Sequence, residues 1–177
     1  MDKGLVHIYH GDGKGKTTCA IGLAMRALGA GYRVIFVQFL KGGDTSELKV
    51  LEHLERVEVV RAKKDYKFTW LLTEEELGLL KSEHNILLEE AIARCHIQDD
   101  ERILLVLDEL CATYEKKLID QEKVLDFIKN RFDNIEVVIT GRNPAKELLD
   151  LADYVSEIKK VKHPMEVGIY ARKGIEM

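Results

Sequence analysis

Glycine, lysine and threonine residues near the start of the chain form a pattern that is suited to holding phosphate. The segment 10–18 reads His-Gly-Asp-Gly-Lys-Gly-Lys-Thr-Thr and lies between an apolar run at 5–9 and a stretch with helical periodicity. Glycine tolerates the backbone dihedrals that turn successive N–H groups toward an anion, while lysine adds charge and threonine adds a hydroxyl ligand for magnesium. We therefore expect a nucleoside triphosphate to be the first ligand of this loop.

The loop matches only the second half of the general phosphate-loop pattern G-x-x-x-x-G-K-[ST], because His10 stands where that pattern has its first glycine. A glycine-rich turn without a ligand is the alternative explanation. Lys14 and Lys16 argue against it, because two cations at a helix N-terminus oppose its dipole unless an anion lies between them. The predicted nucleotide contacts in the loop are Gly11, Asp12, Gly13, Lys14, Gly15, Lys16, Thr17 and Thr18.

Two adjacent acids, Asp108 and Glu109, follow a second apolar run at 103–107. Ligands of open parallel sheets bind beyond the carboxyl ends of the strands, so these acids are expected at the same edge as the glycine-rich loop. A carboxylate there can hold Mg²⁺ directly or through water, with Thr17 as a further ligand. Side chains alternate along a strand, so one acid is expected to point inward and the other to cap the next turn, and the sequence leaves open which.

Arg142 follows another apolar run, at 136–140, and is expected at the same edge. Its planar fork of donors suits phosphate oxygens, so it is a further predicted nucleotide contact. An arginine that merely starts a surface turn would produce the same sequence. Lys41 and Glu47, beyond the run at 33–39, carry the same two explanations.

Short apolar runs alternate with helical patterns along the chain, which predicts an α/β fold with a mostly parallel sheet and helices on both faces. The expected strands are 5–9, 33–39, 57–61, 103–107, 136–140 and 154–158. Their unbroken hydrophobicity predicts that helices cover both faces of the strands. One helix is expected over 17–28, and a longer one is expected after Thr73, which would form a capping box with Glu76 and place His84 in a packed stripe.

Length and composition limit the functional classes. The 177 residues suit a single domain, residues 1–177, and the net charge of −4 gives no basic footprint for nucleic acid. No apolar run approaches the roughly 18 residues of a membrane span, so a soluble cytoplasmic protein without a membrane partner is expected. Cys19, Cys95 and Cys111 are widely spaced, which favours reduced thiols in the core over a metal site.

Beyond these separate features, the chain resembles the P-loop ATP:corrinoid adenosyltransferases, which transfer the adenosyl group of ATP to the cobalt of a corrinoid. The resemblance spans nearly the whole chain and rests on the order and spacing of segments 11–18, 37–42, 68–70, 107–110, 140–142, 152–153, 162–164 and 173–176. The glycine-alternating loop with His10 is the form that this family has. The resemblance therefore implies a P-loop NTPase-like fold.

The resemblance also implies a mechanism. Cobalt reduced to Co(I) attacks the 5′ carbon of ATP and expels intact triphosphate, whose charge Lys14, Lys16, Thr17 and Mg²⁺ would neutralise. The catalytic residues would be Lys16, Thr17 and Glu109, with Thr17, Asp108 and Glu109 as the candidate metal ligands. Phe68 and Trp70 would lie against the corrin ring and exclude both the lower axial ligand of cobalt and water.

Further expectations from the resemblance are an electron donor for Co(II), a homodimer, and a lid formed by other segments or another subunit. That last expectation arises because many relatives carry an extension before the first strand, whereas this chain begins near it. Two other functions are compatible with the phosphate loop. One is a simple ATPase or small-molecule kinase, and the other is a nucleotide-dependent carrier that delivers a corrinoid unchanged.

Overall fold

The computed structural model describes residues 3–40, 45–62, 69–96 and 101–176. All its strands are parallel and form one sheet in the order β3-β2-β4-β5-β1-β6. The strands are β1 (Val6–His10), β2 (Arg33–Gln38), β3 (Val57–Arg61), β4 (Ile103–Asp108), β5 (Ile135–Gly141) and β6 (Tyr154–Glu157). The α-helices are α1 (Lys16–Gly29), α2 (Leu48–Leu51), α3 (Glu74–Cys95), α4 (Leu110–Glu115), α5 (Gln121–Asn130) and α6 (Lys146–Leu151).

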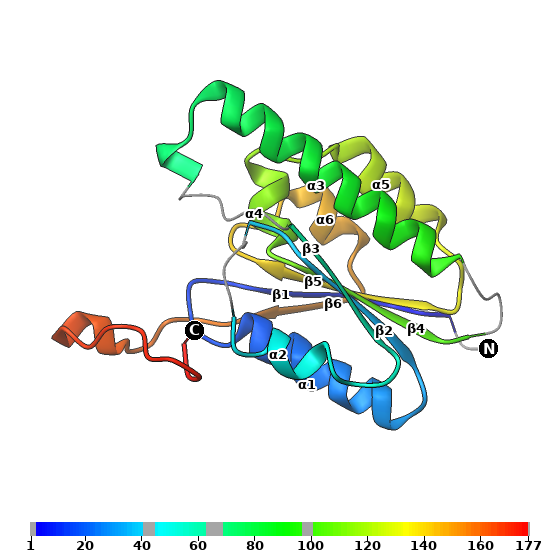
Figure 1. Cartoon of the computed structure of the whole chain (residues 1–177), viewed down its shortest axis with the longest axis horizontal. Helices are drawn as coiled ribbons and strands as arrows, with labels where there is room; N and C mark the ends of the chain where they lie inside the picture. The colour runs from blue at the N-terminus through cyan, green and yellow to red at the C-terminus, as the bar shows by residue number, and fades with distance from the viewer. Residues whose placement is uncertain (1–2, 41–44, 63–68, 97–100, 177) are drawn as a thin grey trace.

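Helices cover both faces of this sheet, which confirms the predicted α/β class. Helices α1 and α2 lie on one face, and α3, α4, α5 and α6 lie on the other (Figure 1). Two 3₁₀ turns complete the described elements: η1 (Thr69–Leu71) and η2 (Pro164–Val167). No helix among the described residues is both long enough and apolar enough to cross a lipid bilayer.

The central strands are buried on both faces, as their apolar runs predicted. In β2, Val34 and Phe36 pack in the cluster that contains Ala20 of α1, whereas Ile35 and Val37 belong to the cluster on the opposite face, with α3. This alternation follows from the two-residue period of a strand. Every predicted strand is present, with its ends displaced by no more than one residue.

Strand β6 does not follow the prediction that both strand faces are covered. All four of its residues are exposed, including Tyr154 at 53% and Val155 at 48%. The strand lies at the edge of the sheet and pairs only with β1. Its apolar sequence identified it as a strand but carried no information about which helices would reach it.

The expected start of α3 is confirmed in detail. The N–H of Glu76 donates to Thr73 Oγ1 at 3.2 Å, and the N–H of Thr73 donates to Glu76 Oε2 at 2.8 Å, which completes the capping box. Helix α1 ends at Gly29, and Gly31 follows with φ 87°, a left-handed conformation that suits glycine. Residues that cap or follow a helix therefore predicted both the start of α3 and the end of α1.

The three cysteines are free thiols, but only two of them lie in the core. Burial raises the pKa of both Cys95 and Cys111 to about 12, so these side chains stay protonated at neutral pH. The predicted core position is wrong for Cys19, which is exposed on α1. Its place on the outer side of that helix explains the difference.

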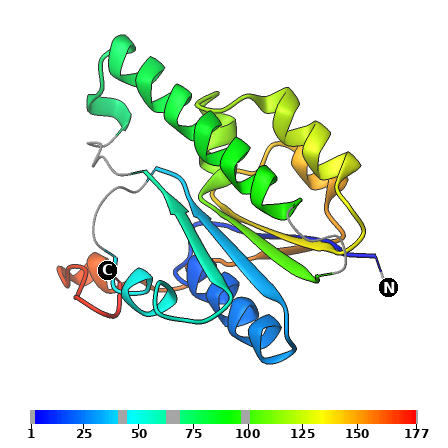
Figure 2. The ribbon, with the colours of Figure 1, turned by 45° about the vertical axis from the view of Figure 1, so that its right-hand side comes forward.

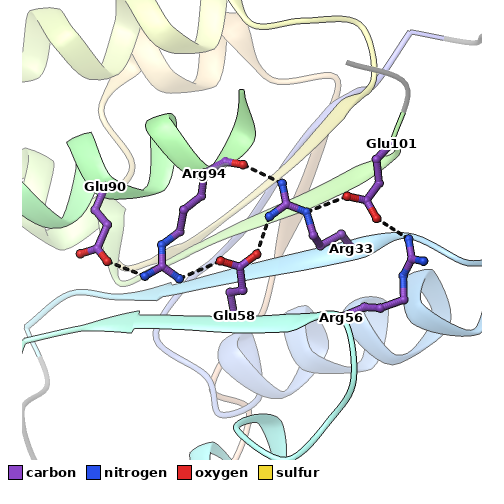
Figure 3. A network of polar contacts seen from close by, with 6 residues as sticks. All are labelled: Arg33, Arg56, Glu58, Glu90, Arg94 and Glu101. Atoms are coloured by element: carbon purple, nitrogen blue, oxygen red, sulfur yellow. Dashed lines mark hydrogen bonds and ion pairs between the residues drawn. The ribbon is translucent and has the colours of Figure 1, made fainter. Parts of the chain in front are cut away.

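A charged network joins α3 to the amino ends of β2, β3 and β4 (Figure 3). The glycine-rich loop follows the carboxyl end of β1, so it lies at the opposite edge of the parallel sheet. Arg33 lies at the centre of the network: Nε is 2.9 Å from Glu101 Oε2, Nη1 pairs with Glu58, and Nη2 donates to the backbone oxygen of Arg94. The side chain of Arg33 is only 12% exposed. Among the described residues, the network contains Arg33, Arg56, Glu58, Glu90, Arg94 and Glu101.

We expect Arg33→Met to lower the free energy of unfolding by about 2 kcal/mol, because two carboxylates would lose a partly buried partner. Lys146→Met is the matched control, since Lys146 pairs with Asp150 on the surface and should change stability by less than about 0.5 kcal/mol. Urea denaturation of the three proteins measures the difference. Equal stability of the two variants would show that the network does not stabilise the fold.

Candidate active site

The glycine-rich loop joins the carboxyl end of β1 to the start of α1. Its conformation requires glycine at three positions. Gly11 and Gly15 have left-handed φ values of 117° and 121°. A Cβ atom would lie 2.4 Å from the backbone oxygen of Ile158 on Gly11, and 2.7 Å from it on Gly13. The glycines of the loop therefore serve both its turn and its close contact with the chain that follows β6.

The chain beyond β6 supports the loop through three hydrogen bonds. The N–H of Gly13 donates to Ile158 O at 2.8 Å, and the N–H of Ile158 donates to His10 O at 2.7 Å. The Asp12 carboxylate accepts the N–H of Lys160 at 3.0 Å, and this bond is the main reason that the pKa of Asp12 is lowered. Asp12, whose contact with a nucleotide stays a prediction, thus fixes the segment that follows β6.

The carboxylate of Asp108 lies at the point where α1, β4 and β5 meet. Its Oδ1 atom accepts the hydroxyl of Thr17 at 2.8 Å and the hydroxyl of Thr140 at 2.7 Å, and its side chain is fully buried. Thr140 Oγ1 in turn accepts the N–H of Glu109 at 3.0 Å. Asp108 is therefore the acid that points inward, a question that the sequence left open.

Glu109 begins the sharp turn from β4 into α4. It has a left-handed φ of 65°, caps no N–H group of the helix with its side chain, and lines the cleft beside the phosphate loop.

The site predicted from the sequence gave Thr140 no role. A polar residue at the end of an apolar strand, next to Gly141, is a signal that could have identified it.

A cleft of about 1170 Å³ lies over the phosphate loop. All the predicted nucleotide contacts except Gly11 line it, including Arg142, and so do Glu109 and Glu47. Residues 159–165, 169–172 and 174–176 form much of its wall. Both ribbon views show this C-terminal segment, coloured orange to red, beside the start of α1 (Figures 1 and 2). The two ends of the chain thus build one site.

An anion from the protein itself lies beside the loop. The Glu176 carboxylate is 3.6 Å from Lys14 Nζ and accepts hydrogen bonds from Arg172 at 2.9 Å and 3.2 Å. Hydrogen bonds from Arg172, with Lys14 nearby, lower the pKa of Glu176 to about 2, so this side chain is ionised at neutral pH. Sequence reasoning assigned no role to Glu176 or Arg172, because nothing local links them to Lys14.

The donor set beside the loop suits magnesium. Thr17 offers a hydroxyl, and Asp108 and Glu109 offer carboxylates. Mg²⁺ prefers such oxygen ligands, and it usually takes one or two carboxylates while it keeps several waters. Within the described residues, no group of three or more His, Cys, Asp or Glu side chains could hold a metal. The oxygen donors of Thr17, Asp108 and Glu109 are of the kind that Mg²⁺ takes.

The comparisons with known proteins identify the family. Residues 2–177 match the family model described as ATP:corrinoid adenosyltransferase BtuR/CobO/CobP. The chain belongs to this family. A corrinoid adenosyltransferase of Pseudomonas aeruginosa is 32% identical over 99% of this chain and 84% of the relative. The corrinoid adenosyltransferase CobA of Salmonella typhimurium is 34% identical over 99% of this chain and 86% of its own length.

Solved structures add support for the fold of this adenosyltransferase family member. The cytoplasmic domain of EssC has a TM-score of 0.55 and 17% sequence identity, with 96% of this chain covered. The structure of EssC ATPases 2 and 3 from Geobacillus thermodenitrificans has a TM-score of 0.50 and 14% identity. This chain spans only about a third of those structures, at 34% and 36%. At such identities the likeness confirms a fold shared with ATPases.

The predicted corrinoid contacts fall at the boundary of the described chain. Phe68 lies outside the described residues. So does Lys41, for which the sequence left open a phosphate contact or a surface turn. Trp70 belongs to the turn η1. The first residue of this turn, Thr69, accepts a hydrogen bond from Lys116, which directly follows α4. Since α4 begins beside Glu109, this contact fixes η1 to a helix that starts at the site.

His84 supports the same edge of the sheet from α3. Its Nδ1 donates to Leu118 O at 2.9 Å, and its Nε2 accepts the N–H of Leu40, just beyond β2, at 3.3 Å. These partners require a neutral ring, and burial lowers the pKa of His84. The predicted packed position of His84 is confirmed, and the side chain is 1% exposed.

Acidification should therefore weaken the fold through His84. With the folded-state pKa below the unfolded value of about 6.5, the unfolded chain takes up the proton first, and stability falls as the pH drops below about 6.5. The loss from this one group is at most about 1.4 kcal/mol per pH unit. Urea unfolding between pH 7.5 and pH 5 measures it.

His84→Gln should flatten this part of the pH profile, because the titrating ring is gone. His53→Gln is the control, since His53 is exposed on the surface and its replacement should leave the profile unchanged. If His84→Gln keeps the slope of the natural protein between pH 6.5 and pH 5, His84 does not titrate as its burial implies.

Proposed function

We propose that this chain transfers the 5′-deoxyadenosyl group of ATP to the Co(I) centre of a corrinoid and releases triphosphate. The main support is one arrangement: the phosphate loop opens into a cleft, and its Thr17 is held by the buried Asp108. The family match over residues 2–177 gives that arrangement its substrates, ATP and a corrinoid. The proposal places the enzyme in the cytoplasm, where ATP is available.

The reaction needs no nucleophile from the protein. The Co(I) of the substrate forms a bond to the 5′ carbon with its own electron pair, the bond from that carbon to oxygen breaks, and triphosphate leaves with the bonding electrons. Cobalt is formally oxidised to Co(III), so an electron donor must first supply Co(I) from Co(II). The work of the protein is to orient ATP and to stabilise the charge of the leaving triphosphate.

Lys16 and Thr17 are the residues we assign to that task. Lys16 Nζ reaches the floor of the loop, where it donates to Gly13 O at 2.9 Å, and both side chains line the cleft. Lys14 and Arg142, on the cleft wall, supply further positive charge. Mg²⁺, when bound, would neutralise phosphate charge, and we assign it to Thr17 and Glu109 with Asp108 behind them.

Phe68 and Trp70 are our proposed corrinoid contacts. Aromatic side chains under the cobalt would exclude its lower axial ligand and water, which eases reduction to Co(I). The hydrogen bond between Thr69 and Lys116 supports this assignment, because it joins the Trp70 turn to the helix that follows Glu109. The chemistry of the cofactor remains its own, and the protein controls access to it.

The proposal predicts a cobalt–carbon bond and intact triphosphate when the protein is incubated with ATP, Mg²⁺ and chemically reduced corrinoid. Visible absorbance follows the bond, and phosphorus NMR identifies the second product. Release of orthophosphate or ADP without corrinoid would instead indicate an ATPase or kinase. Bound corrinoid with unchanged ATP would indicate a carrier.

Lys16→Ala in the same assay should lower turnover by about 10²- to 10³-fold while the protein stays folded, since one donor to the developing charge is lost. Lys81→Ala, on the exposed side of α3, is the matched control and should keep full activity. Turnover of Lys16→Ala at the level of the control would remove the loop from the mechanism.

A homodimer formed through β6 belongs to the same proposal. Parallel strands are ordinarily covered on both faces, yet Tyr154 and Val155 of this edge strand are about half exposed. The exposed apolar side chains continue along the C-terminal segment with Val161 and Met165. A second copy of the chain would cover this surface and could complete the lid of the cleft.

We expect sedimentation equilibrium to show a dimer for the natural chain and a monomer for Val155→Asp, because a charge cannot be buried there without a partner. Val50→Asp is the control, since Val50 is 60% exposed on α2, away from β6. A natural chain that stays monomeric at tens of micromolar concentration would contradict the dimer.

A further inference from the structure

Gln38, the last residue of β2, has an unusual environment. Its side chain is fully buried, and neither its amide nitrogen nor its amide oxygen has a hydrogen-bond partner among the residues that the structure describes. Buried polar groups in proteins are almost always paired, and an unpaired amide costs about as much free energy as a lost hydrogen bond. Such an amide is expected where a ligand completes the site.

The position of Gln38 relates it directly to the phosphate loop. Val34 and Phe36 of the same strand pack with α1, so Gln38, two residues further along, lies on the α1 face as well. Its register partner on β4 is Asp108, on a strand about 4.8 Å away. Asp108 is the carboxylate that holds Thr17 at the start of α1.

A ligand in the cleft can contact Gln38 only through a bridging group. Thr17 lines the cleft, but Gln38 does not, because it lies behind the surface at the level of Asp108. Oδ1 of Asp108 already accepts two hydroxyl groups, from Thr17 and Thr140. A small polar ligand that enters beside Thr17 fits this geometry, and water bound to a metal ion has the necessary size and polarity.

We propose that Gln38 is a positioning residue that forms hydrogen bonds with the hydration shell of the magnesium ion when MgATP is bound. Mg²⁺ gives up its waters reluctantly and keeps several of them in protein sites. The amide oxygen can accept from one metal-bound water, and the amide nitrogen can donate to the oxygen of another water. This inference rests on the proposed function, since it takes MgATP as the ligand.

Gln38→Met tests the proposal, because methionine has a similar length and cannot form these hydrogen bonds. Without ligand, the variant should melt about 2–4 °C above the natural protein, since an unpaired buried amide has been removed. The variant should bind MgATP about tenfold more weakly than the natural protein. This is the smaller end of the roughly 10- to 100-fold loss of affinity that follows the removal of an outer-shell partner of a metal. Differential scanning fluorimetry and titration calorimetry measure the two effects.

Metal-free ATP in the presence of a chelator provides the decisive comparison. We expect Gln38→Met and the natural protein to bind metal-free ATP equally, because the nucleotide itself does not touch Gln38. Gln121→Met is the matched control: Gln121 Nε2 donates to Tyr114 O at 3.0 Å on the other side of the sheet, so its loss should lower stability and leave MgATP affinity unchanged.

Unchanged MgATP affinity in Gln38→Met would overturn the proposal. An equal loss for ATP with and without magnesium would also overturn it, because it would indicate direct contact with the nucleotide. Gln38→Leu repeats the measurements if methionine disturbs folding. If MgATP fails to stabilise even the natural protein, the proposed function fails, an outcome distinct from the failure of the role of Gln38.

Discussion

The hydrogen bonds that converge on the Asp108 carboxylate are the interaction on which the rest of the site depends. A buried carboxylate is tolerated only where hydrogen-bond donors replace water, and here the hydroxyls of Thr17 and Thr140 do so. The two contacts fix the start of α1 against β4 and β5. The phosphate loop, Glu109 and the end of β5 therefore keep a common geometry before any ligand arrives.

The cleft is assembled from the two ends of the chain. The phosphate loop forms its floor, and the segment after β6 forms a wall. This wall also supports the loop, because the N–H of Gly13 donates a hydrogen bond to Ile158 O. The contact between Lys14 and Glu176 shows that this wall already pairs a loop cation with an anion. Lys14 is thus held by an acidic side chain of the wall, whereas Lys16 is held by the backbone oxygen of Gly13.

Much of the fold could be predicted from the sequence, because apolar runs and capping residues act locally. The central strands and the start of α3 at Thr73 followed from such signals. The exposure of β6 and of Cys19 did not, because apolar character in a short run does not show whether another element will cover it. The motifs that carried the resemblance to the corrinoid adenosyltransferases were sufficient to predict the family.

The sequence by itself determined the glycine-rich loop after the first strand, the two acids at the end of the fourth strand and the order of strands and helices, since each is encoded by neighbouring residues. Only the tertiary structure decided that Asp108 points inward, that Thr140 donates to it and that Glu176 reaches Lys14. It also decided that Gln38 is buried with no hydrogen-bond partner in the part of the chain that the structure describes. These facts depend on strands brought together from distant parts of the chain. The physical reason is that a parallel sheet places residues side by side by strand order and register, which local sequence does not encode.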